Sequence, residues 1–307
     1  MLAIVCSGQG HQHRDMFRLT ADAAPAAAIF AAAQFVLGED PRAFVASAPP
    51  ASMHANRTAQ ILCVTQALAA ATMFDQAFGT PRLIAGYSVG ELAAWSVGGA
   101  LLPETIPALA ARRAEIMDAA GAPGDGLAFV RGLNEREVQR LCTAHDVHPA
   151  ITNPGLVFVI GGAGDALDRF ILAARQAGAA RADRLDVNTA SHTPCLAGAM
   201  APFGDALRAA GLHRLHPGTT LVSALDGTRI VDPARQAESL AQQLANTLHW
   251  DQCLDALIER GASAVLELGP GRALADMVTG LRPDLPARSI DDFHEADGLR
   301  AWLAARV

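Results

Sequence analysis

The sequence of 307 residues contains no lysine, because all 24 of its basic residues are arginine. Without a lysine amine the chain cannot form a Schiff base, cannot supply the lysine of a P-loop phosphate site and cannot run a Ser-Lys hydrolase. The formal net charge is -7, so the sequence has no excess of positive charge for binding nucleic acid. These absences exclude three enzyme classes and argue against a nucleic-acid partner.

Cysteine is scarce and long apolar runs are missing. The five cysteines form no CxxC pair, which favours buried free thiols over a zinc site or a disulfide framework. The N-terminal "MLAIVCSGQGH" lacks the basic lead-in of a secretion signal, and the alanine-rich run at residues 23–38 is interrupted by Pro25 and Gln34. We therefore expect a cytoplasmic protein without a membrane segment. The cysteines are Cys6, Cys63, Cys142, Cys195 and Cys253.

What the sequence does contain is an alternation of apolar runs and helical segments. The runs "LAIVC" and "RLIAG" each end in a glycine-containing turn, and helical patterns occupy residues 22–38, 58–77 and 103–121. Alternation of this kind is typical of a parallel sheet covered by helices. The sequence therefore predicts an α/β fold with a large α/β-hydrolase-like domain.

Residues 125–188 have a different texture, with shorter units. Their order reads strand, helix, strand, strand, helix, strand, which matches a ferredoxin-like unit in size and sequence of elements. Helix and strand alternation then resumes. We predict a large α/β domain formed by residues 1–124 and 189–307, with a small ferredoxin-like subdomain inserted at 125–188.

The stretch "GYSVG" places Ser88 between two glycines directly after an apolar run. A G-x-S-x-G sequence between a strand and a helix makes a strained turn that exposes the hydroxyl and directs backbone N–H groups toward the atom it attacks. Small residues at such a turn also serve packing alone. From this motif, Ser88 is either a nucleophile or a residue of a tight turn.

A serine nucleophile needs a base, because its hydroxyl is barely ionised at neutral pH. Among the ten histidines, His192 in "NTASHTPC" follows a strand end and is bracketed by small polar residues, a setting typical of a loop over a site. His11 and His13 form an HxH pair, but no third ligand is evident. The sequence therefore favours His192 as the base and predicts no metal site.

Six motifs taken in order are more specific than any one of them: "SGQGHQ", "GYSVGE", "RRAEIM", "ASH", "QQLANTLHW" and "ELGPG". In order and spacing they resemble the malonyl-CoA:acyl carrier protein transacylase family, over nearly the whole chain and including the inserted subdomain. The resemblance implies an acyltransferase that takes malonyl from malonyl-CoA as a serine ester. An acyl carrier protein, through its phosphopantetheine or a related arm, then removes it. No permanently bound cofactor is implied.

The resemblance also assigns roles around the nucleophile. Ser88 matches the nucleophile, and His192 matches its base and later acid. The backbone N–H groups of Gln9 and Val89 match the oxyanion hole. In this family a backbone carbonyl orients the histidine, and the matching residue is Gln243. No buried aspartate is therefore expected beside His192.

Substrate contacts follow from the same resemblance. Arg113 matches the arginine that pairs with the free carboxylate of malonyl, for which a guanidinium fork is suited. The alternative is a solvated charge, as for the neighbouring Arg112, and the two side chains point about 100° apart on a helix. Gln60 and Tyr87 match positions that line the cleft.

Several positions depart from the usual family pattern. Cys6 and Ser7 stand where Phe-Pro is usual, and Tyr87 stands where histidine is usual. The "TASH" segment differs from the common malonyl-type forms, which leaves a branched malonyl substrate open. The opening "CSGQGHQHRDMF" is more similar to the transacylase that accompanies malonate decarboxylase than to the housekeeping enzyme.

Three alternatives stay open at this point. The first is a housekeeping malonyl transacylase of fatty-acid or polyketide synthesis. The second is a serine acyl-CoA thioesterase or hydrolase, although an α/β-hydrolase would have the order Ser, acid, His and no need of Arg113. The third is a non-catalytic scaffold subunit, which would need neither Ser88 nor His192. A dinucleotide-binding domain is disfavoured because "GGAGDAL" lacks the third glycine of GxGxxG.

Overall fold

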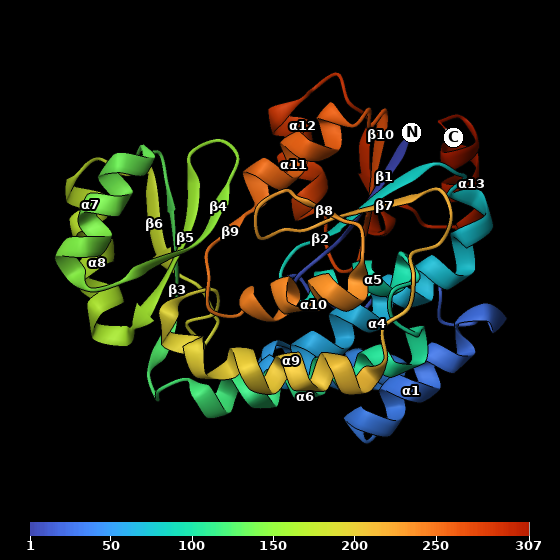
Figure 1. Ribbon diagram of the computed structural model, residues 1–307, viewed down its shortest axis with the longest axis horizontal. Helices are drawn as coiled ribbons and strands as arrows, with labels where there is room; N and C mark the ends of the chain where they lie inside the picture. The colour runs from blue at the N-terminus through green and yellow to red at the C-terminus, as the bar shows by residue number, and fades with distance from the viewer. Residues whose placement is uncertain (307) are drawn as a thin grey trace.

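The computed structural model describes residues 1–306 and has two lobes, each built around its own sheet (Figure 1). In the larger lobe the strand order is β11-β10-β1-β2-β7-β8, with the first five strands parallel and β8 antiparallel to β7. All residues of β1 and β2 are buried, which explains their nearly continuous apolar sequences. The strands are β1 (Leu2–Cys6), β2 (Arg82–Gly86), β7 (Thr219–Val222), β8 (Arg229–Ile230), β10 (Ala264–Leu268) and β11 (Ala287–Ser289).

Helices cover both faces of the larger sheet (Figure 1). Leu2 and Ile4 pack into a core with α4, α5 and α6, whereas Ala3 and Val5 pack into a second core with α11 and α12. Alternate strand side chains point to opposite faces, so β1 contributes to both cores. The helices are α1 (Ala27–Leu37), α2 (Pro41–Ser47), α3 (Pro50–His54), α4 (Asn56–Phe74), α5 (Gly90–Val97), α6 (Ile106–Ala120), α9 (Met200–Ala210), α10 (Pro233–Gln242), α11 (Trp250–Glu259), α12 (Ala273–Leu281) and α13 (Ala296–Ala304).

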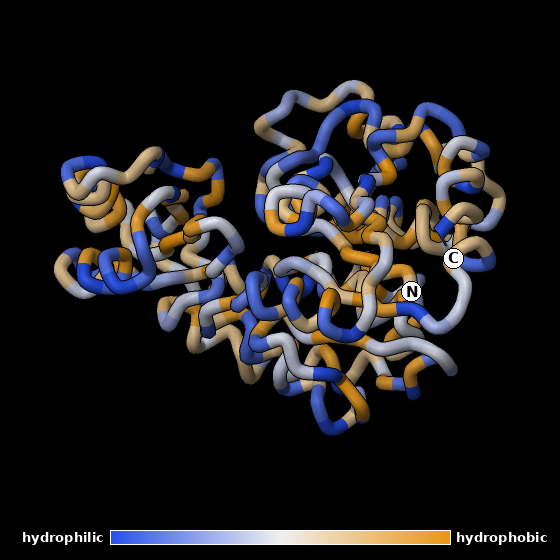
Figure 2. The backbone as a smooth tube through the Cα atoms, turned by 90° about the horizontal axis from the view of Figure 1, so that it is seen from above, coloured by the Kyte–Doolittle hydropathy of each residue, from blue (hydrophilic) through white to orange (hydrophobic). Residues whose placement is uncertain are grey.

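The smaller lobe has the strand order β6-β3-β5-β4, with all three pairs antiparallel. Its two helices pack against one face, where Phe170 is fully buried, and Figure 2 shows this lobe set to one side of the apolar interior of the larger lobe. This order and connectivity is the ferredoxin-like arrangement. Its elements are β3 (Asp125–Arg131), α7 (Glu135–His145), β4 (His148–Asn153), β5 (Val157–Ala163), α8 (Gly164–Gln176) and β6 (Arg181–Arg184).

A fifth strand ties the two lobes together. β9 (Leu248–His249) belongs to the segment between α10 and α11 of the larger lobe, yet it pairs parallel with β4. The other face of the smaller sheet also contributes Leu127 and Val159 to the core that contains α11. The predicted α/β fold class is confirmed. The domain boundaries at residues 124/125 and 188/189 stay a proposal, in which β9 of the large domain pairs with the sheet of the small one.

One expectation about the cysteines is wrong at a single position. Four of the five thiols are buried, but Cys195 is exposed. It lies in the short 3-10 helix Pro194–Ala199, of which Leu196 and Ala199 are the residues that face the core. Within residues 1–306, no helix combines the length and the apolar character needed to cross a membrane.

The turn after β2 leaves no room for side chains at its two glycines. A Cβ atom at Gly90 would lie 2.2 Å from the carbonyl oxygen of Cys6, and one at Gly86 would lie 2.4 Å from backbone atoms of Glu91. Both neighbours are main-chain atoms, which cannot rotate away as a flexible side chain would. The glycines therefore let the turn after β2 approach β1 and the start of α5 closely.

Gly90→Ala is expected to destabilise the protein by about 3 kcal/mol or more, because the new methyl group overlaps the backbone of β1. Thermal denaturation checks this. The matched control is Gly280→Ala in α12, where a Cβ atom meets nothing within 4 Å. That variant is expected to be as stable as the parent or up to about 1 kcal/mol more stable. Equal melting temperatures for both variants would contradict the steric account.

Candidate active site

Ser88 lies in the turn between β2 and α5, at the carboxyl end of a central parallel strand. Its φ of 55° is in the left-handed region, which is uncommon for a residue with a side chain and marks a strained turn. Its Oγ lies 2.8 Å from Nε2 of His192, 104 residues further along the chain. Open parallel sheets place their ligand-binding sites at the carboxyl ends of the strands, where Ser88 lies.

His192 is held from its other side by a main-chain carbonyl. Its Nδ1 lies 2.6 Å from the carbonyl oxygen of Gln243, and its backbone N–H donates to the carbonyl of Leu244 at 2.8 Å. A carbonyl oxygen can only accept, so Nδ1 carries the proton and Nε2 presents a lone pair to Ser88. The imidazole is thereby fixed in the tautomer that can take the serine proton.

Burial and the charge of Arg113 lower the pKa of His192 to about 3. The imidazole is fully buried, and both causes disfavour its charged form. His192 is therefore neutral, and able to accept a proton, over the whole physiological pH range.

This shift predicts the pH dependence of kcat/KM for malonyl-CoA, which reports on the free enzyme. The value should stay level as the pH falls from about 8 to about 5, whereas an ordinary imidazole would lose its basicity near 6.5. Arg113→Ala removes a charge that lowers the pKa of His192, so its residual activity should decline at a higher pH than that of the parent. An acid limb near pH 6.5 in the parent would contradict the account.

Arg113 is buried at the centre of α6, with 2% of its surface exposed. Its Nη1 donates to Oε1 of Gln60 at 2.9 Å and contacts the sulfur of Met117 at 3.3 Å. Its Nη2 lies 3.5 Å from Oε1 of Gln243. These contacts are with neutral groups, and burial lowers the pKa of the guanidinium to about 9. A buried cation held by neutral acceptors is suited to receive an anionic ligand.

The neighbouring Arg112 is the solvated residue of the pair. It is exposed and lies 3.6 Å from Glu115 on the outer face of α6. Gln60, predicted to line the cleft, is fully buried behind Arg113 and is not one of the residues that line the cavity. Its Oε1 accepts from Arg113, and its Nε2 donates to Asn56 at 2.8 Å. Of the two arginines, Arg113 is the one that faces inward.

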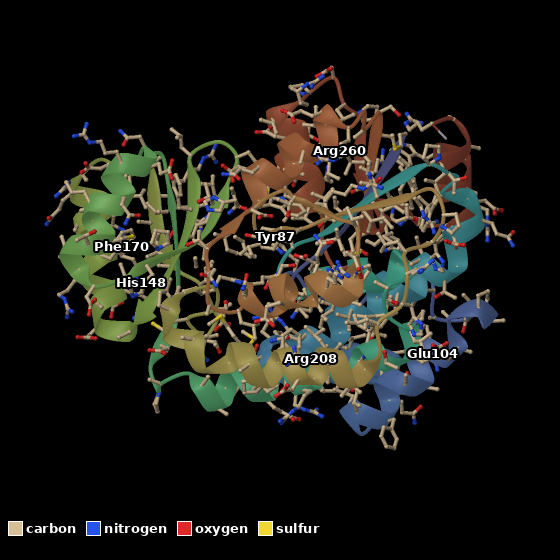
Figure 3. The ribbon with its side chains drawn as sticks, viewed as in Figure 1. Tyr87, Glu104, His148, Phe170, Arg208 and Arg260 are labelled. Carbon is tan, nitrogen blue, oxygen red and sulfur yellow. The ribbon has the colours of Figure 1, made fainter. Side chains whose placement is uncertain are left out.

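Ser88, His192 and Arg113 share one cavity of about 530 Å³ between the lobes. Figure 3 shows Tyr87 in this region between the lobes, with Phe170 and His148 in the smaller lobe. The Tyr87 ring stands edge-on to Trp250 at 5.3 Å, and burial raises the pKa of its phenol. The wall includes Gln9, Tyr87, Ser88, Arg113, Met117 and His192 from the larger lobe and Leu127, Phe129 and Val159 from the smaller lobe.

The loop after β1 lies against the Ser88 turn. A Cβ atom at Gly8 would lie 2.9 Å from the carbonyl oxygen of Tyr87, so only glycine allows this approach. Gln9 follows in the same loop and lines the cavity, and Val89 is the N-cap residue directly before α5. The structure thus brings together the two segments whose backbone N–H groups we predict to form the oxyanion hole.

The HxH pair has another explanation than metal binding. His13 lies 2.8 Å from a carboxylate oxygen of Asp291, which raises the pKa of the imidazole, and His11 lines the cavity. In the part of the chain that the structure describes, no group of three histidine, cysteine, aspartate or glutamate side chains is placed to hold a metal ion.

Comparison with known proteins accounts for this arrangement. The model of the acyl transferase domain family matches residues 3–283, which is most of the chain. The chain belongs to the acyl transferase family. The predicted family is thereby confirmed. The similarity to the transacylase that accompanies malonate decarboxylase stays a prediction.

Curated relatives and solved structures of the acyl transferase family agree with this assignment. The chain is 32% identical over 222 residues to a malonyl CoA-acyl carrier protein transacylase of Mycobacterium bovis, covering 72% of each chain. It is 28% identical over 300 residues to the transacylase of the same name from Salmonella typhimurium, covering 94% of this chain and 96% of that one.

Two solved structures align over 99% of both chains. An acyl-carrier-protein S-malonyltransferase of Burkholderia pseudomallei aligns with a TM-score of 0.90 at 26% identity. A malonyl-transacylase in complex with a type II polyketide synthase acyl carrier protein aligns with a TM-score of 0.91, also at 26% identity. The two-lobed fold is therefore that of the malonyltransferases.

Proposed function

We propose that this acyl transferase moves a malonyl group from malonyl-CoA to the thiol of an acyl carrier protein, through an ester on Ser88. The observation that carries the proposal is the Ser88 Oγ–His192 Nε2 contact of 2.8 Å in a cavity that also holds the buried Arg113. The names of the relatives support the same donor and acceptor.

In the first half-reaction Ser88 becomes acylated. Nε2 of His192 takes the Ser88 proton as Oγ attacks the thioester carbonyl. The backbone N–H groups of Gln9 and Val89 stabilise the oxyanion, and each such donor is worth about 3 kcal/mol in the transition state. When the intermediate collapses, the C–S bond breaks and the CoA thiolate receives the proton from His192.

The second half-reaction runs the same steps in reverse order. The carrier thiol gives its proton to His192 and attacks the Ser88 ester. The C–O bond then breaks, and Oγ recovers the proton from Nε2. Throughout, the carbonyl of Gln243 holds the ring by its Nδ1–H and stabilises the imidazolium that forms in each half-reaction. These steps use side chains and backbone groups of the chain, so we propose a reaction without a bound cofactor or metal.

Arg113 supplies selectivity for a carboxylated acyl group. Its guanidinium can form two parallel hydrogen bonds with the free malonyl carboxylate, which would gain a cationic partner in a cavity with apolar walls. An acetyl group would leave that cation without an anion. The "TASH" segment, which differs from the common malonyl-type forms, reaches the cavity through Ser191, and substituted malonyl groups stay a second candidate donor.

The test separates transfer from hydrolysis. Release of CoA from malonyl-CoA is measured with and without a phosphopantetheine-bearing acyl carrier protein, and the carrier is weighed by mass spectrometry. We expect CoA release to depend on the carrier and to match the malonyl-carrier formed. Equal release without the carrier would indicate the thioesterase alternative, and no release from a folded protein would indicate the scaffold alternative.

A further inference from the structure

A fully buried carboxylate, Glu91, lies beneath the site. It is on the first turn of α5, three residues after Ser88. One carboxylate oxygen accepts from Nε2 of Gln243 at 2.6 Å and from the backbone N–H of Ala224 at 3.1 Å. The other accepts from Nε1 of Trp95 at 3.4 Å. All three partners are N–H donors, which favour the ionised form of the carboxylate.

The partner of Glu91, Gln243, contacts three functional groups at once. Its backbone carbonyl accepts from Nδ1 of His192, its side-chain oxygen lies 3.5 Å from Nη2 of Arg113, and its side-chain nitrogen donates to Glu91. The carboxylate on one side and the guanidinium on the other dictate which end of the amide is oxygen and which is nitrogen. Gln243 is itself buried, so these are its available partners in place of water.

Charge balance points to the same network. A buried guanidinium needs a compensating anion, and Arg113 contacts only neutral groups directly. Through the Gln243 amide it is connected to Glu91, whose charge favours the protonated arginine. Burial raises the pKa of Glu91 to about 7, and the nearby negative charge of Asp226 acts in the same direction, whereas the N–H donors of Ala224 and Trp95 and the charge of Arg113 lower it.

We propose that Glu91 is a positioning residue of the transfer reaction. It holds the side chain of Gln243 and thereby sets both the guanidinium of Arg113 and the carbonyl that orients His192. This inference rests on the proposed malonyl transfer. If the contact between Gln243 and Arg113 is lost, activity with carboxylated donors should fall. If the contact between Gln243 and His192 is lost, activity with every acyl donor should fall.

Two variants test the network by the ratio of kcat/KM for malonyl-CoA to that for acetyl-CoA. Glu91→Gln keeps the size of the side chain but removes its charge and one acceptor. Gln243→Met keeps the backbone carbonyl and removes both amide contacts. Each should lower the malonyl-to-acetyl ratio about tenfold, since a hydrogen bond to a charged group is worth roughly that factor or more. A role in stability alone would lower the melting temperature and leave the ratio unchanged.

The double variant shows whether Glu91 acts through Gln243. If it does, Glu91→Gln combined with Gln243→Met should have the ratio of Gln243→Met alone. A double variant whose ratio falls by the product of the two single-variant changes would contradict the proposal. Should Glu91→Gln fail to fold, an unchanged ratio in Gln243→Met would contradict it equally.

Gln66→Met is the matched control for Gln243→Met. Gln66 is also buried and donates from Nε2 to a carboxylate oxygen of Asp291 at 2.9 Å, but it is outside the Gln243 network and is not one of the residues that line the cavity. Its malonyl-to-acetyl ratio should equal that of the parent. If the parent itself transfers no malonyl, the proposed function fails; if the parent transfers malonyl and Glu91→Gln keeps its ratio, only this inference fails.

Discussion

Replacing Ser88 by alanine is expected to lower the rate of malonyl transfer to the carrier by about 10⁵ to 10⁶, the loss typical of removing a serine nucleophile. Alanine has no oxygen that can carry the acyl group, so the two half-reactions are no longer linked by a covalent intermediate. The φ of 55° at this position strains alanine about as much as serine, because both have a Cβ atom. The fold should therefore be retained. Steady-state transfer from malonyl-CoA measures the effect.

A second serine of the same cavity provides the control for Ser88. Ser191 is buried beside His192 and lines the cavity, but the base contacts Ser88. Ser191→Ala should therefore reduce transfer by less than about tenfold, the effect of a modest packing change. Comparable losses in the two variants, or full activity in Ser88→Ala, would contradict the assignment of the nucleophile.

The second large effect is expected for Arg113→Ala, in selectivity. Removing one member of a buried guanidinium–carboxylate pair typically costs 2–5 kcal/mol, so kcat/KM for malonyl-CoA should fall by about 10² to 10³. Acetyl-CoA has no carboxylate, and its kcat/KM should stay level or rise as the cavity loses a cation. Competition between the two donors, read from the acyl group on the carrier, measures this change of preference.

Arg112→Ala is the control for the second prediction. Arg112 is adjacent in sequence but exposed, and its contact with Glu115 lies on the surface of α6. Surface ion pairs contribute little, so malonyl preference in this variant should match that of the parent within about twofold. An unchanged preference in Arg113→Ala would place the carboxylate contact on another residue.

Elements with a long, regular pattern could be predicted from the sequence. β1 and β2 are continuous apolar runs that end in glycine-containing turns, and the six units within residues 125–188 alternate in a recognisable order. β8 and β9 could not be predicted, since each has only two residues, too few to show a pattern, and β9 pairs with β4, a strand distant in the chain. β9 also joins the two sheets, a relation that no local pattern encodes.

The site could be predicted where a motif fixes the local geometry. Ser88 could be singled out from its flanking glycines. The close backbone contacts at these two positions leave no room for a side chain. The choice between Arg112 and Arg113 needed the family motif, because helical spacing shows only that the two diverge. Glu91 could not be predicted as a partner of Gln243, since 152 residues separate them and tertiary packing alone brings them to 2.6 Å.

The central claim is that malonyl passes through Ser88, and intact-protein mass spectrometry after brief incubation with malonyl-CoA tests it most directly. The account predicts one added malonyl group, located on the peptide that contains Ser88, absent from Ser88→Ala and removed when a phosphopantetheine-bearing carrier protein is added. Acetyl-CoA and methylmalonyl-CoA, incubated separately, show which acyl groups the cavity accepts. An adduct on another residue, or malonyl transfer to the carrier with no adduct at Ser88, would contradict the account.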